Sequence, residues 1–219
     1  MIYVCEIDFY VEYLRYQDLL DSVNENRRNV ISHLFKKDDK IRSLLSQKLM
    51  EYAISNFLTI PVSQLVFEFN KYGKPELLSH SNVFFNISHC GNWLVCIVEN
   101  DPVGVDIEKL VGYTTDTIDI FCSSKEKELL HLSGDPKNLY YKFWTLKAIG
   151  TGLFRDPKDV EVSFINEHQS RIILDKSYWL GRSIVINDEY VLSSVSSSSL
   201  EYHKYINISA DTFYYESIS

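Results

Sequence analysis

Two carboxylates separated by one residue stand in the stretch VGVDIEK, at Asp106 and Glu108. The stretch is expected to form a strand, in which residues i and i+2 point to the same face. Two carboxylates on one face repel each other unless a cation or a proton relieves them. Oxygen ligands with open positions suit Mg²⁺, which keeps waters and usually recruits a phosphate as well. The spacing alone also fits a solvated strand end with Lys109 as the partner of the two carboxylates.

Ser88 and His89 lie where an expected strand over residues 83–87 runs into a turn closed by Gly91. Neighbouring residues of a strand point in opposite directions, so these two side chains do not easily form a nucleophile and base pair. A hydroxyl and an imidazole at such a junction suit donation to a phosphate oxygen. The structural alternative is a capped turn.

Basic residues form two groups in the N-terminal third of the chain. The sequence KYGKP places Lys71 and Lys74 on either side of a tight turn. A second cluster comprises Arg27, Arg28, Lys36, Lys37, Lys40 and Arg42. In a chain of net charge -8, this concentration of positive charge could hold a multiply phosphorylated ligand. The alternatives are a soluble hairpin tip and a solvated helix face.

Trp144 and Lys147 are three residues apart in a segment expected to be helical, so they share one helix face. That arrangement could present a cation to a ligand. The alternative is that Trp144 packs in the core while the Lys147 stem covers apolar surface with its ammonium in water.

The elements that must position these residues follow from periodicity. We expect strands at 2–9, 64–70, 83–87, 93–99 and 103–109, a weaker helix at 17–35, and a strong helix at about 39–57. Ser123 and Glu126 form a capping box before a helix at 123–132, and a further helix at 136–148 is expected to end at Gly150. Four strands follow as a meander, with Asn187 and Asp188 as a two-residue hairpin turn.

This order of elements predicts an α+β fold with antiparallel sheets packed by helices. The rough repetition suggests two similar halves related by a pseudo-twofold axis. The expected division is residues 1–105, the N-terminal half with the basic residues, and residues 106–219, the C-terminal half with the carboxylate pair and the Trp144 helix. Two internal halves would make a monomer sufficient.

Composition narrows the class of protein. The 219 residues are 45% hydrophobic, enough for a sizeable core, and the net charge of -8 disfavours a nucleic-acid or anionic-membrane binder. No run of 18 apolar residues and no basic leader occurs, so neither a membrane span nor a signal peptide is expected. Cys5, Cys90, Cys96 and Cys122 lack metal-like spacing and are expected to be reduced thiols of a cytoplasmic protein.

The order and separation of YGKP, FNISHCGNW, DPVGVDIEK, FCSSKEKELL and FWTLKA resemble the 4′-phosphopantetheinyl transferases, in particular the branch that activates surfactin-type peptide synthetases. The resemblance implies two similar α/β halves with coenzyme A bound between them. It also implies transfer of the phosphopantetheine arm of coenzyme A to a serine of an acyl or peptidyl carrier protein, as in nonribosomal peptide and antibiotic biosynthesis. The other product would be adenosine 3′,5′-bisphosphate.

The resemblance further implies residue roles. Asp106 and Glu108 match the Mg²⁺ ligands of the family and count with Lys147 as catalytic residues. Residues that match the family's contacts to coenzyme A are Ser88 and His89 at its phosphates, and Lys74, Arg42 and Arg27 at its nucleotide end. Mg²⁺ on the diphosphate would neutralise charge at the reacting centre, while a carboxylate or a water ionised by the metal takes the serine proton.

One part of the sequence departs from the family pattern. The family helix reads W-x-x-K-E-(S/A)-aromatic-x-K and leads to a G-x-G-L turn, whereas here WTLK runs straight into AIGTGLF. A gap of about five residues after Lys147 would remove about 7.5 Å of helix and roughly 140° of rotation. The catalytic Glu and the second Lys are missing, and losing a general base costs about 10²–10⁴ in rate. The sequence therefore predicts an Mg²⁺-dependent transferase, active or impaired, or, alternatively, a non-catalytic relative that binds coenzyme A or a carrier protein.

Overall fold

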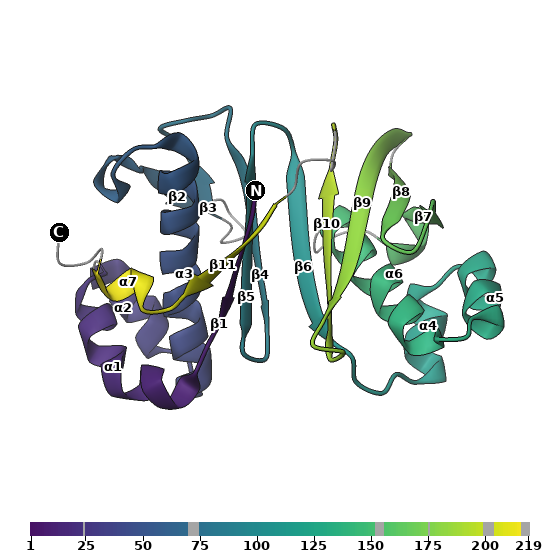
Figure 1. The fold of residues 1–219 in the computed structure, drawn as a ribbon, viewed down its shortest axis with the longest axis horizontal. Coiled ribbons are helices and arrows are strands. Elements are labelled where there is room, and N and C mark those ends of the chain that lie inside the picture. The colour runs from purple at the N-terminus through teal and green to yellow at the C-terminus, as the bar shows by residue number, and fades with distance from the viewer. Residues whose placement is uncertain (24, 70–74, 152–155, 175, 199–203, 216–219) are drawn as a thin grey trace. The chain divides into compact units, whose positions relative to one another are not determined.

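The computed structural model describes residues 1–23, 25–69, 75–151, 156–174, 176–198 and 204–215. The chain divides into two compact units, the first formed by Met1–Asn100 with Lys204–Ser219 and the second by Asp101–His203. Each unit packs helices against a largely or wholly antiparallel sheet (Figure 1). The predicted α+β class is therefore confirmed.

The first unit contains a four-stranded sheet in the order β11-β1-β5-β4. β5 (Trp93–Glu99) pairs antiparallel with both β1 (Ile2–Glu6) and β4 (Phe84–Cys90). β11 (Tyr205–Ser209) lies parallel to β1, as the yellow strand beside the purple one shows in Figure 1. β2 (Phe67–Phe69) and β3 (Pro75–Leu77) pair as a separate two-stranded sheet.

α3 (Lys37–Leu58) carries the main apolar face of the first unit. Ile41, Leu44, Leu45 and Leu49 recur at helical spacing, are buried as one apolar stripe, and belong to one core cluster with Leu94 and Cys96 of β5. The 3₁₀ helix η1 (Val62–Gln64) follows it. Although α3 has 22 residues, no helix among the described residues has an apolar stretch long enough to cross a membrane.

The expected helix over residues 17–35 is in fact two helices, and the first of them begins earlier, at Phe9. Asp8 accepts hydrogen bonds from the amides of Tyr10 and Val11 at 3.0 and 3.3 Å and so caps α1 (Phe9–Asp21). α2 (Glu25–Ser32) follows after a break. The first strand therefore ends at Glu6 and not at residue 9, because the Asp8 cap starts the helix.

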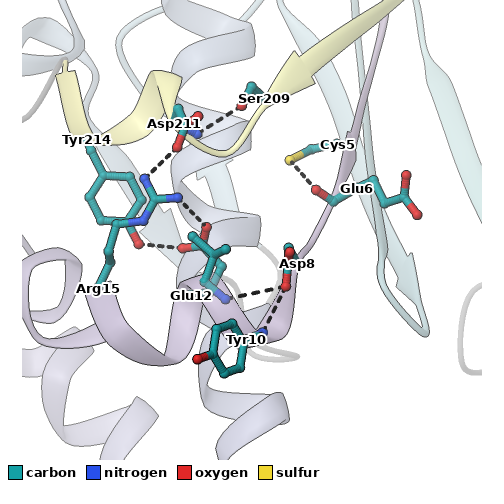
Figure 2. A network of polar contacts seen from close by, with 10 residues as sticks. Cys5, Glu6, Asp8, Tyr10, Glu12, Arg15, Ser209, Asp211 and Tyr214 are labelled. Atoms are coloured by element: carbon teal, nitrogen blue, oxygen red, sulfur yellow. Dashed lines mark hydrogen bonds and ion pairs between the residues drawn. The ribbon is translucent and has the colours of Figure 1, made fainter.

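A charge network attaches the short helix α7 (Thr212–Tyr215) to α1 (Figure 2). The Tyr214 hydroxyl donates to the buried Glu12 carboxylate. Arg15 pairs with Glu12 at 3.5 Å and with Asp211, and its guanidinium lies 4.4 Å from the Tyr214 ring centroid. Burial raises the pKa of Glu12. The hydrogen bond from Tyr214 and the positive charge of Arg15 partly oppose this rise. Residues 205–215 thus belong to the first unit and not, as the division at 106–219 expected, to the second.

The second unit contains a five-stranded sheet in the order β6-β10-β9-β8-β7, with every pairing antiparallel. Its strands are β6 (Val103–Lys109), β7 (Glu161–Phe164), β8 (Gln169–Leu174), β9 (Ser177–Ile186) and β10 (Tyr190–Ser196). The expected boundary between residues 105 and 106 falls inside β6.

The turn between β9 and β10 has three residues and not the predicted two, because Ile186 pairs with Tyr190. Asn187 and Asp188 both take positive φ values, 51° and 56°. Both residue types tolerate this left-handed region better than most, so the sequence located the turn correctly but not its length.

α6 (Pro136–Thr151) packs on β10 and β6, and its Phe143 and Leu146 are fully buried in the core of the second unit. The helix runs on through Gly150, so the expectation that Gly150 ends it is wrong. α4 (Thr115–Phe121), α5 (Ser124–Leu132) and the 3₁₀ helix η3 (Pro157–Asp159) complete the unit. The predicted capping box of Ser123 and Glu126 starts α5.

Candidate active site

The carboxylates of Asp106 and Glu108 lie on one face of β6. Both are half-buried, and they alternate with Val105 and Ile107, which are 2% and 1% exposed. In the antiparallel register Asp106 stands opposite Ser193 of β10. The predicted shared face of the two carboxylates is therefore present in the structure.

That face is the one covered by α6. Directly opposed residues of antiparallel strands point to the same side, and the Ser193 Oγ lies 2.6 Å from the Oγ1 of Thr145 in α6. Two residues before Asp106, a Cβ added at Gly104 would stand 2.0 Å from the Cγ2 of Ile149. Glycine at position 104 is thus what lets α6 approach β6 beside the carboxylate pair.

Ser88 and His89 lie inside β4 and not in the turn that the sequence predicted. Ser88 pairs with Val95 and His89 with Leu94, and β4 continues to Cys90. His89 is exposed and shares its face with the core residue Leu94, while Ser88 is half-buried on the opposite face. Gly91, with φ of 58°, then turns the chain into β5.

Arg42 of α3 reaches this turn. Its Nη1 donates to the carbonyl oxygen of Gly91 at 3.0 Å, and its Nη2 pairs with Asp39. The guanidinium also lies 5.4 Å from the Phe9 ring centroid. The structure therefore brings Arg42 to the end of the strand that carries Ser88 and His89, in the first unit.

Arg27 connects two helices. Its Nη2 donates to the carbonyl oxygen and to the Oγ of Ser43, both at 2.8 Å, so it ties α2 to α3. Burial lowers the pKa of Arg27. Lys74, the other residue expected at the nucleotide end of coenzyme A, lies outside the described residues.

Lys147 is fully buried and faces the core of the second unit. Its Nζ donates to the Glu126 Oε2 at 2.6 Å and to the carbonyl oxygen of Phe121 at 3.1 Å. Trp144, one turn earlier, stacks on the Phe121 ring at 4.4 Å between centroids. From the sequence, Glu126 was expected only to cap α5, and its ion pair with Lys147 was not predicted. The one indication of this ion pair in the sequence was that FCSSKE, which contains Glu126, and W-x-x-K, which ends in Lys147, occur in the same chain.

Asp106 and Glu108 fit a divalent cation in residue type and placement. Among the described residues, no group of three or more His, Cys, Asp or Glu side chains could hold a metal ion together. Ala148 directly follows Lys147 in the continuous helix, where a third carboxylate would stand. Mg²⁺ retains several waters, so two protein carboxylates can be enough to hold it.

Comparison with known proteins identifies the class. A family model described as 4′-phosphopantetheinyl transferase, N-terminal, matches residues 12–101, and one described as the 4′-phosphopantetheinyl transferase superfamily matches residues 102–195. The two matches are contiguous and meet close to the division between the two units. The chain belongs to the 4′-phosphopantetheinyl transferase superfamily.

Several curated relatives carry the same name. The chain is 33% identical over 131 residues to the 4′-phosphopantetheinyl transferase ffp of Bacillus subtilis, a match that covers 59% of this chain and 58% of the relative. It is 29% identical over 183 residues to gsp of Aneurinibacillus migulanus, covering 78% and 71%. It is 31% identical over 127 residues to Sfp of Bacillus subtilis strain 168, covering 57% of each. The match thus spans less than two thirds of ffp and Sfp.

Proposed function

We propose that this chain transfers the 4′-phosphopantetheine arm of coenzyme A to a serine of an acyl or peptidyl carrier protein, with Mg²⁺ as cofactor. One structural observation carries the proposal beyond family membership. Asp106 and Glu108 present two carboxylates on the α6 face of β6, beside the close approach at Gly104. Two carboxylates on one face are suitable ligands for a cation that must also bind phosphate.

The residues of the second unit would hold the metal. Mg²⁺ held by Asp106 and Glu108 would neutralise negative charge on the diphosphate of coenzyme A. With these two carboxylates as its ligands among the described residues, the ion would keep coordination positions for waters and a phosphate oxygen.

The residues of the first unit would bind the coenzyme. Arg42 places a planar guanidinium at the β4–β5 turn. The exposed His89 lies two residues before Gly91 of that turn and presents its ring nitrogens there. Both groups suit phosphate oxygens. We assign Ser88 and Lys74 to the same ligand on the strength of the family resemblance. Arg27 is the weakest assignment, because it lies at the faint end of the family resemblance.

The rate of transfer should be low. Ala148 stands where the resemblance places a glutamate that completes the metal site and takes the serine proton. Lys147 contributes through its buried bond to Glu126 and not by direct contact with a phosphate. A missing general base lowers a rate by about 10²–10⁴.

We further propose that the carriers belong to peptide synthetases of the kind served by surfactin-type activators, and that the chain acts as a monomer in the cytoplasm. Binding to nucleic acid or to an anionic membrane is not expected at a net charge of -8.

Incubation of the chain with Mg²⁺, coenzyme A and an apo carrier protein tests the proposal. The mass of the carrier should rise by one phosphopantetheine, and chelation of Mg²⁺ should prevent the increase. A second candidate, a non-catalytic binder of coenzyme A, is favoured by Ala148 and by the buried Lys147. It predicts Mg²⁺-dependent binding of coenzyme A with no change in carrier mass after prolonged incubation.

A further inference from the structure

The guanidinium of Arg42 is held by three groups of the first unit at the β4–β5 turn. Its Nη1 donates to the carbonyl oxygen of Gly91 at 3.0 Å, and its Nη2 pairs with the carboxylate of Asp39. The third group is the aromatic ring of Phe9, whose centroid lies 5.4 Å from the central carbon of the guanidinium. Two oxygen acceptors and one aromatic face therefore determine where this cation lies.

The ion pair with Asp39 is the restraint most open to water. The Asp39 side chain is 43% exposed and that of Arg42 18% exposed. Ion pairs at the surface hold their partners weakly, because water and salt screen the two charges. The pair with Asp39 is therefore not enough to fix the orientation of the guanidinium, and the remaining restraints are the Gly91 carbonyl and the Phe9 ring.

The Phe9 ring restrains the cation without using an oxygen acceptor. The face of an aromatic ring attracts a guanidinium within about 6 Å of its centroid. A guanidinium has five N–H donors in one plane. In the part of the chain that the structure describes, Gly91 and Asp39 accept from Arg42. The other donors can serve the oxygens of a phosphate, which a guanidinium often binds through two parallel hydrogen bonds.

The segment that carries Phe9 also holds the β4–β5 turn. The amide of Ile7 donates to the carbonyl oxygen of Asn92 at 2.7 Å, and the Asn92 side-chain amide donates to the Glu6 carboxylate at 2.8 Å. Asp8 then caps α1, so that the helix begins at Phe9. The ring is partly buried against the core of the first unit. The ring and the turn therefore share one support, which fixes the position of the ring beside the turn.

We propose that Phe9 is a positioning residue, whose ring holds the Arg42 guanidinium at the β4–β5 turn in the orientation that contacts a phosphate of coenzyme A. The inference rests on the proposed function, which assigns Arg42 to the coenzyme. Because Phe9 acts through the cation, its effect on binding should require both an aromatic ring at position 9 and a positive charge at position 42. An aliphatic side chain at position 9 would fill the space but would not attract the guanidinium.

Calorimetric titration of coenzyme A into the full chain, with Mg²⁺ present, tests the proposal without turnover. The attraction between a cation and a ring at a partly exposed site changes an equilibrium constant by about two- to fivefold, and we expect Phe9→Leu to bind coenzyme A more weakly by this factor. Phe9→Tyr keeps the ring and should bind like the unchanged chain. Tyr10→Leu makes the matching change at the next residue of α1, which is 75% exposed, and should also leave the affinity unchanged.

A double-mutant cycle separates this role from a purely structural one. Arg42→Met removes the cation and should weaken binding of coenzyme A by itself. In the Arg42→Met chain, the further change Phe9→Leu should have no effect, because the ring then has no cation to hold. If the ring served only the packing of α1, Phe9→Leu would weaken binding by the same factor whether or not Arg42 is present.

Equal affinity of Phe9→Leu and the unchanged chain would overturn the inference. So would the same loss from Phe9→Leu in both arms of the cycle, or a loss in Phe9→Tyr as large as that in Phe9→Leu. Unchanged affinity in Arg42→Met would overturn the assignment of Arg42 to the coenzyme, on which the inference depends. Absence of coenzyme A binding by the unchanged chain would instead overturn the proposed function, and this inference with it.

Discussion

The Nζ of Lys147 lies 2.6 Å from the Oε2 of Glu126, and both side chains are almost fully buried, at 0% and 3% exposed. The same Oε2 accepts the amide hydrogen of Ser123, so one carboxylate both caps α5 and neutralises the lysine of α6. The bond joins α5 to α6 across 21 residues of sequence. Lys147 therefore stabilises the helix that faces the carboxylate pair, and its charge is already satisfied within the protein.

Replacing Lys147 tests this assignment. Lys147→Met leaves the buried Glu126 without a cation, and breaking a buried ion pair costs about 3–5 kcal/mol. The double variant Lys147→Met, Glu126→Gln should recover most of that loss, because glutamine still accepts from Ser123 and carries no charge. Urea unfolding measures both. Wild-type stability in Lys147→Met together with lost binding of coenzyme A would mean that Lys147 contacts the ligand instead.

A glutamate at position 148 should raise activity. Ala148 lies one helical turn after Thr145, whose partner Ser193 stands opposite Asp106, and one residue before Ile149, which touches Gly104. Ala148→Glu thus adds a carboxylate on the side of α6 that faces β6, and supplying a general base is worth about 10²–10⁴ in rate. The rate of carrier modification is the measurement, with Ala148→Gln as a control of equal size. Equal rates for the two variants would show that position 148 does not reach the reacting groups.

Removing Asp106 should abolish the effect of the metal. Asp106→Ala leaves Glu108 as the single carboxylate of the pair, which holds Mg²⁺ poorly. Calorimetry should show binding of coenzyme A that no longer depends on Mg²⁺. Asp101→Ala removes the same charge from the exposed turn before β6 and should behave like the unchanged chain. Full Mg²⁺ dependence in Asp106→Ala would exclude the carboxylate pair as the metal site.

Cysteine reactivity offers a test that needs no turnover. Burial raises the pKa of Cys5 and Cys96 to about 12 and that of Cys122 to about 11. These thiols stay protonated at pH 8 and should resist iodoacetamide, since the thiolate is the nucleophile. Cys90 is partly exposed and shares a strand face with Ser88. Mass spectrometry should find one fast adduct, at Cys90, and coenzyme A should slow it. Equal labelling with and without coenzyme A would argue against a ligand at this strand.

The network in Figure 2 should contribute to stability. Tyr214→Phe removes the hydroxyl that donates to Glu12, a buried carboxylate, and losing such a bond costs about 1–3 kcal/mol. The pKa of Glu12, already raised by burial, should rise further, because the Tyr214 bond lowers it. The midpoint of urea unfolding measures the loss. Tyr13→Phe removes a tyrosine hydroxyl whose bond to Asp38 lies at the surface, and it should have a much smaller effect.

Features that depend on local sequence were predictable. The alternation in VGVDIEK placed Asp106 and Glu108 on one face of a strand, and the Ser123 and Glu126 box marked the start of α5. The apolar stripe of α3 was equally clear. Each depends on residues within one or two turns of a helix or within one strand.

Features that depend on distant partners were not predictable. His89 was expected in a turn, but pairing with Leu94 extends β4 past it. Lys147 was expected at the surface or at a phosphate, because nothing near it in sequence shows that Glu126 folds back against it. The helix also continues through Gly150, since burial on β10 and β6 outweighs the intrinsic cost of glycine in a helix.

The parallel pairing of β11 with β1 has a consequence for biosynthesis. Residues 205–209 leave the ribosome after all of the second unit, so the outer side of β1 has no strand to pair with until then. An unpaired strand edge invites association with other chains. The order of translation therefore lets the second unit fold first, as an insert, while the first unit waits for its last strand and is the part most exposed to aggregation in the cell.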